Sequence, residues 1–148
     1  MPTIVSPISG TPPAVNPTST AAEEYFLQRD GDRDLVFAGW VIGHAQECRE
    51  THWRNYRCVS VTLFATESDN LVIQACRWQE ERADEEATPT KQELNDCEVV
   101  VVDWGLTNHA IEWLKKDAGG KLGPTSKAAW VEACGNWEEL KDEGVERV

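Results

Sequence analysis

The sequence predicts an α+β domain in which an antiparallel sheet of three to five strands precedes two C-terminal helices packed on one face. Two pairs of strand-like runs lie between residues 23 and 78, and two apolar stripes at helical spacing follow residue 106. The 148 residues, with 41% hydrophobic and 27% charged side chains, have the size and composition of one globular domain. We therefore expect a single domain over residues 23–148.

Residues 1–22 are expected to form a flexible arm. They hold five of the seven prolines of the chain, together with many serines and threonines. Because proline lacks a backbone donor and interrupts any apolar period, the segment predicts neither a helix nor a strand.

The first pair of runs, EEYFLQR and DRDLVFAGWVIGHA, predicts a hairpin around the dipeptide Asp30-Gly31, which favours a tight turn. A short helix is the alternative, because Thr20 and Glu23 have the spacing of a capping box. The second pair, residues 56–66 and 71–78, is rich in β-branched and aromatic residues and is joined by the turn-forming residues ESDN.

If the registers of the two hairpins agree, alternate residues divide between a core face and an opposite face. The core face is expected to hold Leu35, Phe37, Val41, Val59, Val61, Leu63, Leu71, Ile73 and Ala75. The opposite face is expected to hold Trp40, Ile42, His44, Ser60, Thr62, Phe64, Gln74, Cys76 and Trp78.

The acidic stretch after Trp78, which contains Pro89, is interpreted as a mobile loop, and the apolar run 98–104 as a buried strand. A helix is then predicted from its N-cap Thr107 to the stop at Gly119-Gly120. Its inward stripe is Leu106, Ala110, Trp113 and Leu114. A last helix should open at Thr125 or Ser126 after Pro124, with Gly135 as a weak point. Its inward residues are expected to be Trp130, Val131, Cys134 and Trp137.

Three short stretches resemble the strand-rich part of the bacterial EXLDI family. They are EEYFLQRDG followed by Phe37-Ala38-Gly39, then residues 61–66, and then residues 71–73. The resemblance implies the order of sheet before helices and assigns no site. The chain departs from the family in its Pro- and Thr-rich start and in its ending, EELKDEGVERV, which lacks the signature that names the family.

The charge of the chain restricts its partners. A formal net charge of −12 repels nucleic-acid backbones and anionic lipid surfaces, so neither nucleic acid nor membrane is an expected direct partner. No apolar run reaches the roughly 20 residues that cross a bilayer, and no secretion signal is evident, which predicts a cytoplasmic protein. Five widely spaced cysteines without a Cys-x-x-Cys pair predict reduced thiols.

Two patterns in the sequence resemble metal sites. His44, Cys48 and His52 recur at intervals of four residues, with Cys58 beyond them, and supply ligand types that zinc prefers. They fall on a predicted strand end and loop, where this spacing does not converge, and a surface loop is the alternative. The run 30–34 opens like a calcium loop but lacks the required Gly and Glu, so we expect neither metal there nor a cofactor elsewhere.

Candidate catalytic residues are Cys97, Asp103 and His109, because Asp103 could orient His109 if the helix folds back on the preceding strand. No nucleophile elbow is present, and GGKLGPTS lacks the spacing of a phosphate-binding loop. The sequence thus favours a protein that is not an enzyme.

The leading hypothesis is a non-enzymatic protein-binding or regulatory accessory protein of a bacterium or mobile element. It would bind a protein with a basic surface through an aromatic sheet face at Trp40, Phe64 and Trp78, or through the acidic loop Glu80 to Glu98. The alternative is a small enzyme or small-molecule binder with a pocket between sheet and helices, using His109 and Asp103 or the loop of His44, Cys48 and His52. Exposed sheet edges also make a homodimer compatible with the sequence.

Overall fold

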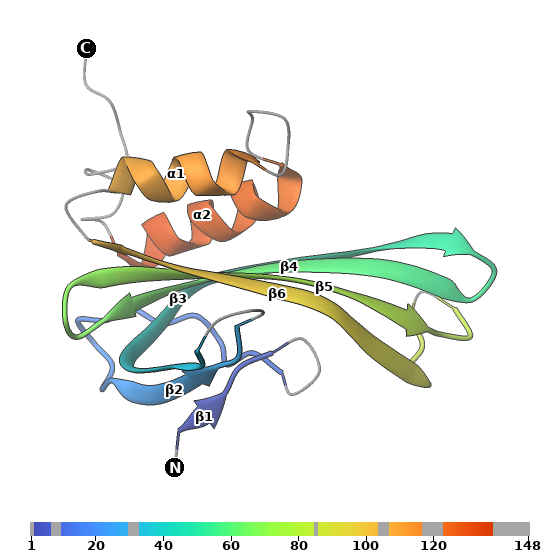
Figure 1. Ribbon diagram of the computed structural model, residues 1–148, viewed down its shortest axis with the longest axis horizontal. Helices are drawn as coiled ribbons and strands as arrows, with labels where there is room; N and C mark the ends of the chain where they lie inside the picture. Colours follow the sequence, from blue (N-terminus) through green and yellow to red (C-terminus); the bar gives the residue numbers. More distant parts are fainter. Residues whose placement is uncertain are drawn as a thin grey trace.

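Six strands form one mixed sheet, and two helices cover one of its faces (Figure 1). This computed structural model describes residues 2–6, 10–29, 33–84, 86–103, 107–116 and 123–137. The elements of this part are β1 (Thr3–Ile4), β2 (Glu23–Leu27), β3 (Leu35–His52), β4 (Asn55–Thr66), β5 (Asn70–Glu81), β6 (Lys91–Asp103), α1 (Thr107–Lys115) and α2 (Pro124–Asn136).

The predicted α+β class, with two helices at the C-terminal side, is confirmed. The predicted number of strands is wrong, since the described sheet has six, and the sheet is mixed because β1 runs parallel to β2. Both errors arise at short or polar segments: β1 has two residues in the proline-rich arm, and β6 begins at Lys91, inside the stretch interpreted as an acidic loop.

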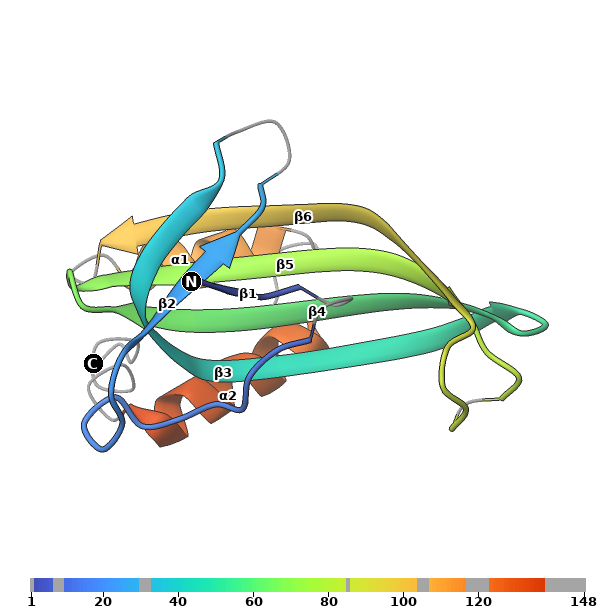
Figure 2. The same ribbon diagram turned by 90° about the horizontal axis from the view of Figure 1, so that it is seen from below.

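The strands follow one another in chain order, so every neighbouring pair from β2 to β6 is a simple antiparallel connection. Both predicted hairpins are present, as the β2–β3 and β4–β5 pairs. The long strands β3 to β6 extend well beyond the two helices (Figure 1). Figure 2 shows β2 and the beginning of β3 crossing the face of the sheet that lies opposite the helices.

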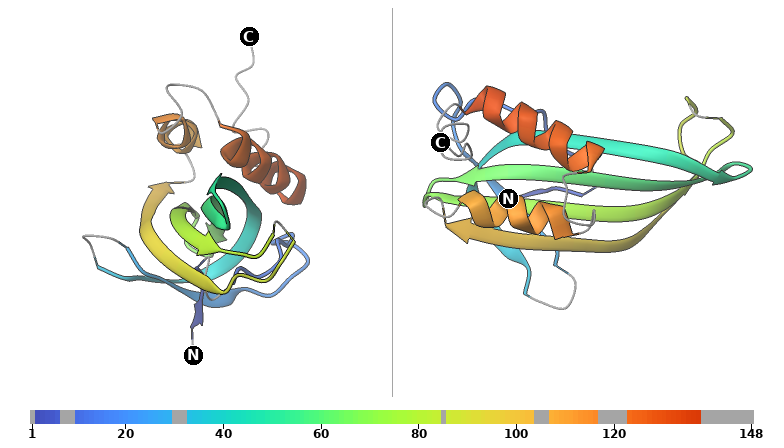
Figure 3. Two further views of the ribbon diagram at one scale, coloured as in Figure 1. Left: turned by 90° about the vertical axis from the view of Figure 1, so that its right-hand side faces the viewer. Right: turned by 90° about the horizontal axis from the view of Figure 1, so that it is seen from above.

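The helices pack on the face formed by alternate residues of β4 and β5. α1 lies over β5 and β6, whereas α2 lies over β3 and β4 (Figure 3). The core between these layers is made of Ile42, Val61, Leu63, Ala65, Leu71, Ile73, Ala75, Val102, Ala110, Leu114, Ala129 and Ala133. The predicted core face of β4 and β5 is therefore confirmed, except that Val59 is 37% exposed.

The opposite face of the sheet is also covered near the helices. Its core consists of Val5, Tyr25, Leu27, Val41, Phe64 and Val72. The segment predicted as an arm contributes here, because the Gln74 side-chain amide donates to the Val5 carbonyl (3.1 Å) and the Val15 amide donates to the Val41 carbonyl (2.8 Å). A third cluster occupies the same face further out and comprises Tyr56, Cys58, Cys76, Trp78 and Cys97.

A β-bulge at Ile42 overturns the predicted faces of β3. Val41 pairs with Phe64, but Gly43 pairs with Leu63, so one residue of β3 is inserted between them. The first part of β3 therefore places Val41 with Phe64 and turns Ile42 toward the helices, opposite to the prediction. Leu35 and Phe37 likewise pack beside Val41 and not on the helix side.

The helix α2 approaches the sheet closely at this bulge. A Cβ atom added to Gly43 would lie 2.3 Å from the Ala129 carbonyl oxygen and 2.9 Å from the Ala133 Cβ. The buried stripe of α2 is accordingly Ala129 and Ala133, whereas the predicted inward residue Val131 is 61% exposed. The other predicted inward residues, Trp130, Cys134 and Trp137, are partly buried and pack against this core, but only the small residues Ala129 and Ala133 fit where the two backbones meet.

Two side chains of α2 bind the backbone along the edge of β3. The Glu132 carboxylate accepts a hydrogen bond from the His44 amide (2.8 Å), and the Asn136 side-chain amide donates to the Ile42 carbonyl (2.9 Å). β2 pairs only with the first residues of β3, from Leu35 to Gly39. The α2 side chains thus satisfy backbone groups that no strand of the described sheet reaches.

α1 agrees with the prediction, since it begins at Thr107 and buries Ala110 and Leu114. Several predictions fall outside the described residues, namely those for the Asp30-Gly31 turn and calcium-like run, Trp104, Leu106 and Gly119-Gly120. Neither described helix has the length and apolar character required to cross a membrane.

Candidate functional site

The ends of the long strands that lie farthest from the helices form the candidate site, which we call the outer end (residues 48–58, 78–84 and 86–93). Trp53 and Arg54 make the turn between β3 and β4, and Arg54 has a φ of +64°. Trp53 is 75% exposed. The Arg54 guanidinium lies 4.1 Å from the centre of the Trp53 ring. This cation–π contact orients the indole but leaves most of it exposed to solvent.

Behind this turn a disulfide joins the two strands. Cys48 and Cys58 are paired across β3 and β4 and form one disulfide, and Cys76 and Cys97 form a second across β5 and β6. The prediction of reduced thiols is therefore wrong for these four residues. Their sequence separations of 10 and 21 residues carry no motif, and only the strand register brings them together.

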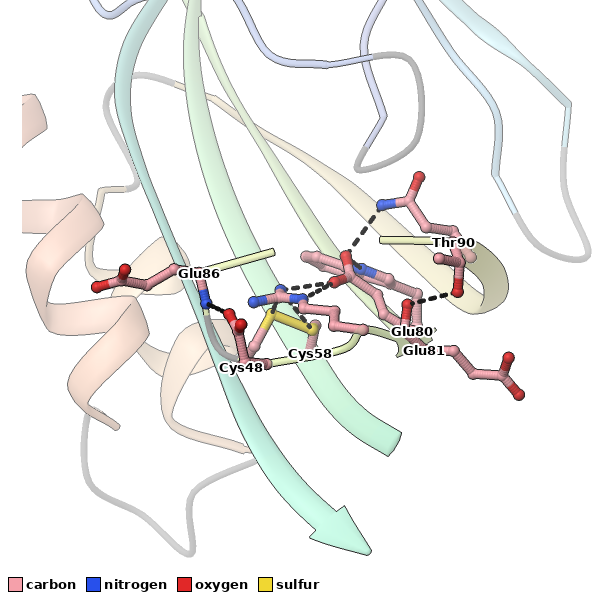
Figure 4. Close-up of polar contacts among 10 residues, drawn as sticks. Cys48, Cys58, Glu80, Glu81, Glu86 and Thr90 are labelled. Carbon is pink, nitrogen blue, oxygen red and sulfur yellow. Dashed lines mark hydrogen bonds and ion pairs between the residues drawn. A yellow bond between two sulfur atoms is a disulfide. The ribbon is translucent and has the colours of Figure 1, made fainter. Parts of the chain in front are cut away.

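A buried carboxylate lies beside the first disulfide (Figure 4). Glu80, which is 4% exposed, accepts hydrogen bonds from the Trp78 indole (2.6 Å) and the Gln92 side-chain amide (2.9 Å) and forms an ion pair with Arg82. Burial raises the pKa of the Glu80 carboxyl, but these hydrogen bonds and the charge of Arg82 outweigh burial. The pKa of Glu80 thus lies below its usual value, and the group is a carboxylate at neutral pH.

Arg82 contacts the Glu80 carboxylate, the Cys48–Cys58 disulfide and the turn between β3 and β4. Its Nη2 atom lies 3.0 Å from the Sγ atom of Cys48 and 3.9 Å from that of Cys58, and its guanidinium lies 4.9 Å from the centre of the Tyr56 ring. Its backbone amide donates to the Arg54 carbonyl (3.0 Å). The β3–β4 turn is thereby fixed to the end of β5.

A hollow of about 320 Å³ opens at this end of the sheet. Its lining includes Trp53, Arg54, Glu81, Arg82 and Thr90. Thr90 is held in place because its amide and its hydroxyl both donate to the Glu81 carbonyl (2.8 and 3.2 Å; Figure 4). The hollow therefore combines an exposed aromatic ring with a fixed polar wall.

Among the described residues, one set of potential metal ligands comes together, at the outer end. Sγ of Cys48, Sγ of Cys58 and a carboxylate oxygen of Glu80 lie within 4.8 Å of one another. As long as the two sulfurs are joined they offer no thiolate, and Arg82 supplies a positive charge at the same place. In the oxidised state these residues do not fit a metal ion.

The sequence-predicted metal candidates His44, Cys48 and His52 do not converge. All three lie on β3, because the strand continues to His52 where a loop was predicted. Residues four apart on a strand are about 13 Å apart. His44 instead makes a hydrogen bond through Nδ1 to the Thr62 hydroxyl (2.8 Å), and burial holds its pKa below the usual value against hydrogen bonding to Gln46 and the charge of Glu132.

The predicted exposed patch of Trp40, Phe64 and Trp78 is not formed. Phe64 and Trp78 are buried, at 0% and 1% exposure, and lie in two different clusters. Trp40 packs on the helix side, and its indole donates to the Thr20 carbonyl (2.8 Å). The bulge in β3 separates Trp40 from the other two, and β2 with the N-terminal segment covers Phe64.

The three catalytic candidates, Cys97, Asp103 and His109, differ in their surroundings. Cys97 is bonded to Cys76 and 4% exposed, so it offers no free nucleophile. His109 is exposed in the first turn of α1, and Asp103 is exposed at the end of β6. A role for these two residues stays a prediction.

A separate cleft of about 270 Å³ lies between the sheet and the helices. Its floor includes Val59, Val61 and Ala75, and its walls include Trp113 of α1 and the start of α2. The Thr125 hydroxyl donates to the Glu47 carboxylate (3.2 Å) at its rim. None of the predicted residues His44, Cys48, His52, Asp103 and His109 lines this cleft.

Sequence reasoning missed Trp53 as a site residue, and it included Glu80 and Arg82 only as members of the predicted acidic loop Glu80 to Glu98. A usable signal was present, because Trp78, Glu80 and Arg82 alternate and share one face if the strand is extended past Trp78. The acidic character of this stretch favoured a loop and concealed the period. Trp53 carried no such signal, since its exposure depends on the length of β3.

Comparisons of the chain with protein-family models, curated protein sequences and solved structures find no match. The resemblance to the EXLDI family therefore stays a prediction.

Proposed function

We propose that the protein is a non-enzymatic binding module, whose partner is a protein with a basic surface and whose docking surface is the outer end of the sheet. The observation that carries the proposal is Trp53, which is 75% exposed beside the 320 Å³ hollow. Tryptophan and arginine are the residues that most often dominate binding energies at protein interfaces. Trp53 and the stacked Arg54 offer such a pair at the tip of a projecting hairpin.

The support beneath Trp53 favours binding without large rearrangement. The Cys48–Cys58 disulfide and the hydrogen bond from Arg82 to the Arg54 carbonyl restrain the hairpin. A surface that is ordered before it meets its partner loses less conformational entropy on binding. The buried contacts of Glu80 thus serve the exposed residues above them.

The net charge of the chain favours a basic partner, although the β3–β4 side of the outer end carries Arg49, Arg54 and Arg57. The chain carries a net charge of −12, and the β5–β6 side of the outer end exposes Glu81, Asp84, Glu86 and Glu93. A basic surface is complementary to this side, and electrostatic attraction between them raises the rate of association. The proposed interface therefore includes the predicted acidic segment, much of which is strand.

The proposal is tested with immobilised full-length protein exposed to a lysate of the source cells at low salt. We expect it to retain a basic protein, and we expect retention to weaken as salt rises through the physiological range, because exposed charges are screened within about 8–10 Å. The substitution Trp53→Ala should weaken the measured affinity of the identified partner at least about tenfold.

The matched control is Val131→Ala, which shortens a residue that is 61% exposed on α2, away from the outer end. Its affinity should equal that of the wild type. The proposal is rejected if no basic protein is retained at low salt, if retention ignores salt, or if Trp53→Ala binds as tightly as Val131→Ala.

A second candidate function, the binding of a small molecule, is favoured by the 270 Å³ cleft between sheet and helices. Its lining joins apolar groups of Val61 and Trp113 to the polar groups of Glu47 and Thr125. Such a cleft suits a small ligand with an apolar part and a hydrogen-bond donor for the carboxylate, although its volume is slightly below the roughly 300 Å³ where typical ligand pockets begin.

The second function is tested by screening a metabolite library with the wild type. At least one compound should raise the melting temperature by a few degrees at saturating concentration. Val59→Phe fills the cleft and should abolish the shift, whereas Val36→Phe, at a site 51% exposed on β3 outside the cleft, should preserve it. Equal shifts in both variants would mean that the ligand binds outside the cleft. The absence of any shift in the wild type would contradict small-molecule binding.

The disulfides bear on the compartment in which the module acts. The lack of a bilayer-spanning apolar run and of an evident secretion signal predicts the cytoplasm, whereas two disulfides are typical of oxidising compartments. Cytoplasmic localisation therefore stays a prediction, and counting the free thiols of protein quenched directly in the source cells would test it.

A further inference from the structure

The two disulfides of the sheet differ in their exposure. Cys48, on β3, is partly exposed, whereas Cys58, Cys76 and Cys97 are 1%, 1% and 4% exposed. A thiolate from solution must approach a sulfur atom directly to displace its partner. Of the four bonded cysteines, Cys48 is therefore the one that an external thiol can reach.

A fixed cation also lies against the Cys48–Cys58 disulfide. The Nη2 atom of Arg82 is 3.0 Å from Sγ of Cys48 and 3.9 Å from Sγ of Cys58, so the guanidinium lies beside both sulfurs and nearer to Cys48. The guanidinium is held there by its ion pair with the buried Glu80 carboxylate and by the face of the Tyr56 ring. A nearby guanidinium stabilises a thiolate over a thiol, and a better stabilised thiolate leaves a disulfide faster.

We propose that the Cys48–Cys58 disulfide is a site of thiol–disulfide exchange with low-molecular-weight thiols, with Cys48 as the sulfur attacked and Arg82 as the residue that stabilises the departing thiolate. The inference does not depend on the proposed protein partner. It assigns to the outer end a chemistry that binding alone does not require.

The exchange balances in two steps. A thiolate RS⁻ attacks the Cys48 sulfur, a new S–S bond joins Cys48 to R, and the electron pair of the broken bond remains on Cys58 as a thiolate beside Arg82. A second RS⁻ attacks the sulfur of the attached thiol, which releases RSSR and leaves Cys48 as a thiolate. Two thiolates are oxidised to one disulfide, and the protein disulfide gains two electrons.

The first test treats the native full-length protein with reduced glutathione, quenches samples with acid over time, alkylates free thiols and maps them by mass spectrometry. Early samples should carry glutathione on Cys48 and the alkyl label on Cys58, with Cys76–Cys97 still intact. Cys134, which is in neither disulfide and is partly buried, reports labelling from the start. Opening of Cys76–Cys97 at an equal or greater rate, or glutathione on Cys58, would overturn the proposal.

The second test concerns Arg82. Arg82→Met should slow the opening of Cys48–Cys58 about three- to tenfold, because a thiolate that has lost its stabilising charge leaves a disulfide more slowly. Arg82→Lys keeps the charge and should react at a rate close to that of the wild type. Arg77→Met is the matched control, since Arg77 lies on β5, which ends just before Arg82, but pairs with Asp96.

Equal rates in Arg82→Met and Arg77→Met would remove Arg82 from the mechanism. Circular dichroism shows whether each variant is folded. If Arg82→Met unfolds, Arg82→Lys and the selectivity of the wild type decide the proposal: an Arg82→Lys rate tenfold below that of the wild type, or loss of selectivity for Cys48, contradicts it.

Discussion

Gly43→Ala is expected to lower the free energy of unfolding by about 3 kcal/mol, at the upper end of what overpacking usually costs. The added Cβ would meet the backbone oxygen of Ala129 at 2.3 Å and the backbone nitrogen of Ala133 at 2.9 Å. Backbone atoms cannot rotate away as a flexible side chain can. The helix α2 must therefore move away from β3, which also disturbs the hydrogen bonds of Glu132 and Asn136 to that strand.

The measurement is chemical denaturation of the purified variant beside Gly135→Ala. A Cβ at Gly135 meets nothing within 4 Å, so alanine there should stabilise the protein by a few tenths of a kcal/mol up to about 1 kcal/mol through its helix propensity. The two substitutions make the same chemical change and have opposite expected signs. A Gly43→Ala protein as stable as the wild type would show that α2 does not pack on β3 as described.

Glu80→Ala is expected to cost about 3–5 kcal/mol, which is the usual effect of removing one member of a buried ion pair. The change leaves Arg82 without its buried carboxylate and removes the acceptor for the Trp78 indole and the Gln92 amide. Trp78 itself is 1% exposed, so its indole has no access to water as a substitute. Glu81→Ala, one residue further along the strand and exposed, should change the stability by less than about 0.5 kcal/mol.

The same carboxylate predicts how stability depends on pH. The pKa of Glu80 is lower in the folded protein than in the unfolded chain, so the unfolded chain binds the proton first as the pH falls. Its stabilising contribution is therefore complete above a pH of about 4.5 and is lost as the pH falls below that value, toward the folded pKa. Denaturation curves from pH 7 to pH 3 should show a smaller loss in Glu80→Ala than in the wild type. Parallel losses would mean that Glu80 is not held as a carboxylate.

The sequence was sufficient for the elements whose local pattern agrees with their final environment. The turn residues of ESDN, the β-branched runs beside them and Pro124 at the start of α2 act over a few residues, and each predicted its element. The sorting of Val61, Leu63 and Ile73 to one face followed from simple alternation.

The faces of β3 could not be predicted in the same way. One inserted residue at Ile42 reverses every side chain before it, and nothing in the sequence VFAGWVIGH marks the position of the insertion. Gly43 is the nearest sign, but its role depends on α2, which lies more than 80 residues away in the chain. The expected patch of Trp40, Phe64 and Trp78 failed for this reason.

The cysteines illustrate a second limit. Spacing rules detect ligands and bridges that are close in sequence, whereas Cys48–Cys58 and Cys76–Cys97 each join facing positions of two adjacent strands. Their pairing can be read only after the register is known. Extending β5 to Glu81 would have aligned Trp78, Glu80 and Arg82, but the charges of that segment resemble those of a solvated loop.

The contacts of Glu132 and Asn136 with the margin of β3 limit how copies of this chain can aggregate. An incoming strand would find the backbone groups of His44 and Ile42 already occupied, so it could not extend the sheet continuously there. β6 is the last strand of the described sheet and forms its other margin, with one irregularity at Asn95. If two copies paired antiparallel along β6, the free backbone groups of β6 would be occupied in both copies. Pairing through β6 would therefore give a two-fold dimer and would not continue into a fibre.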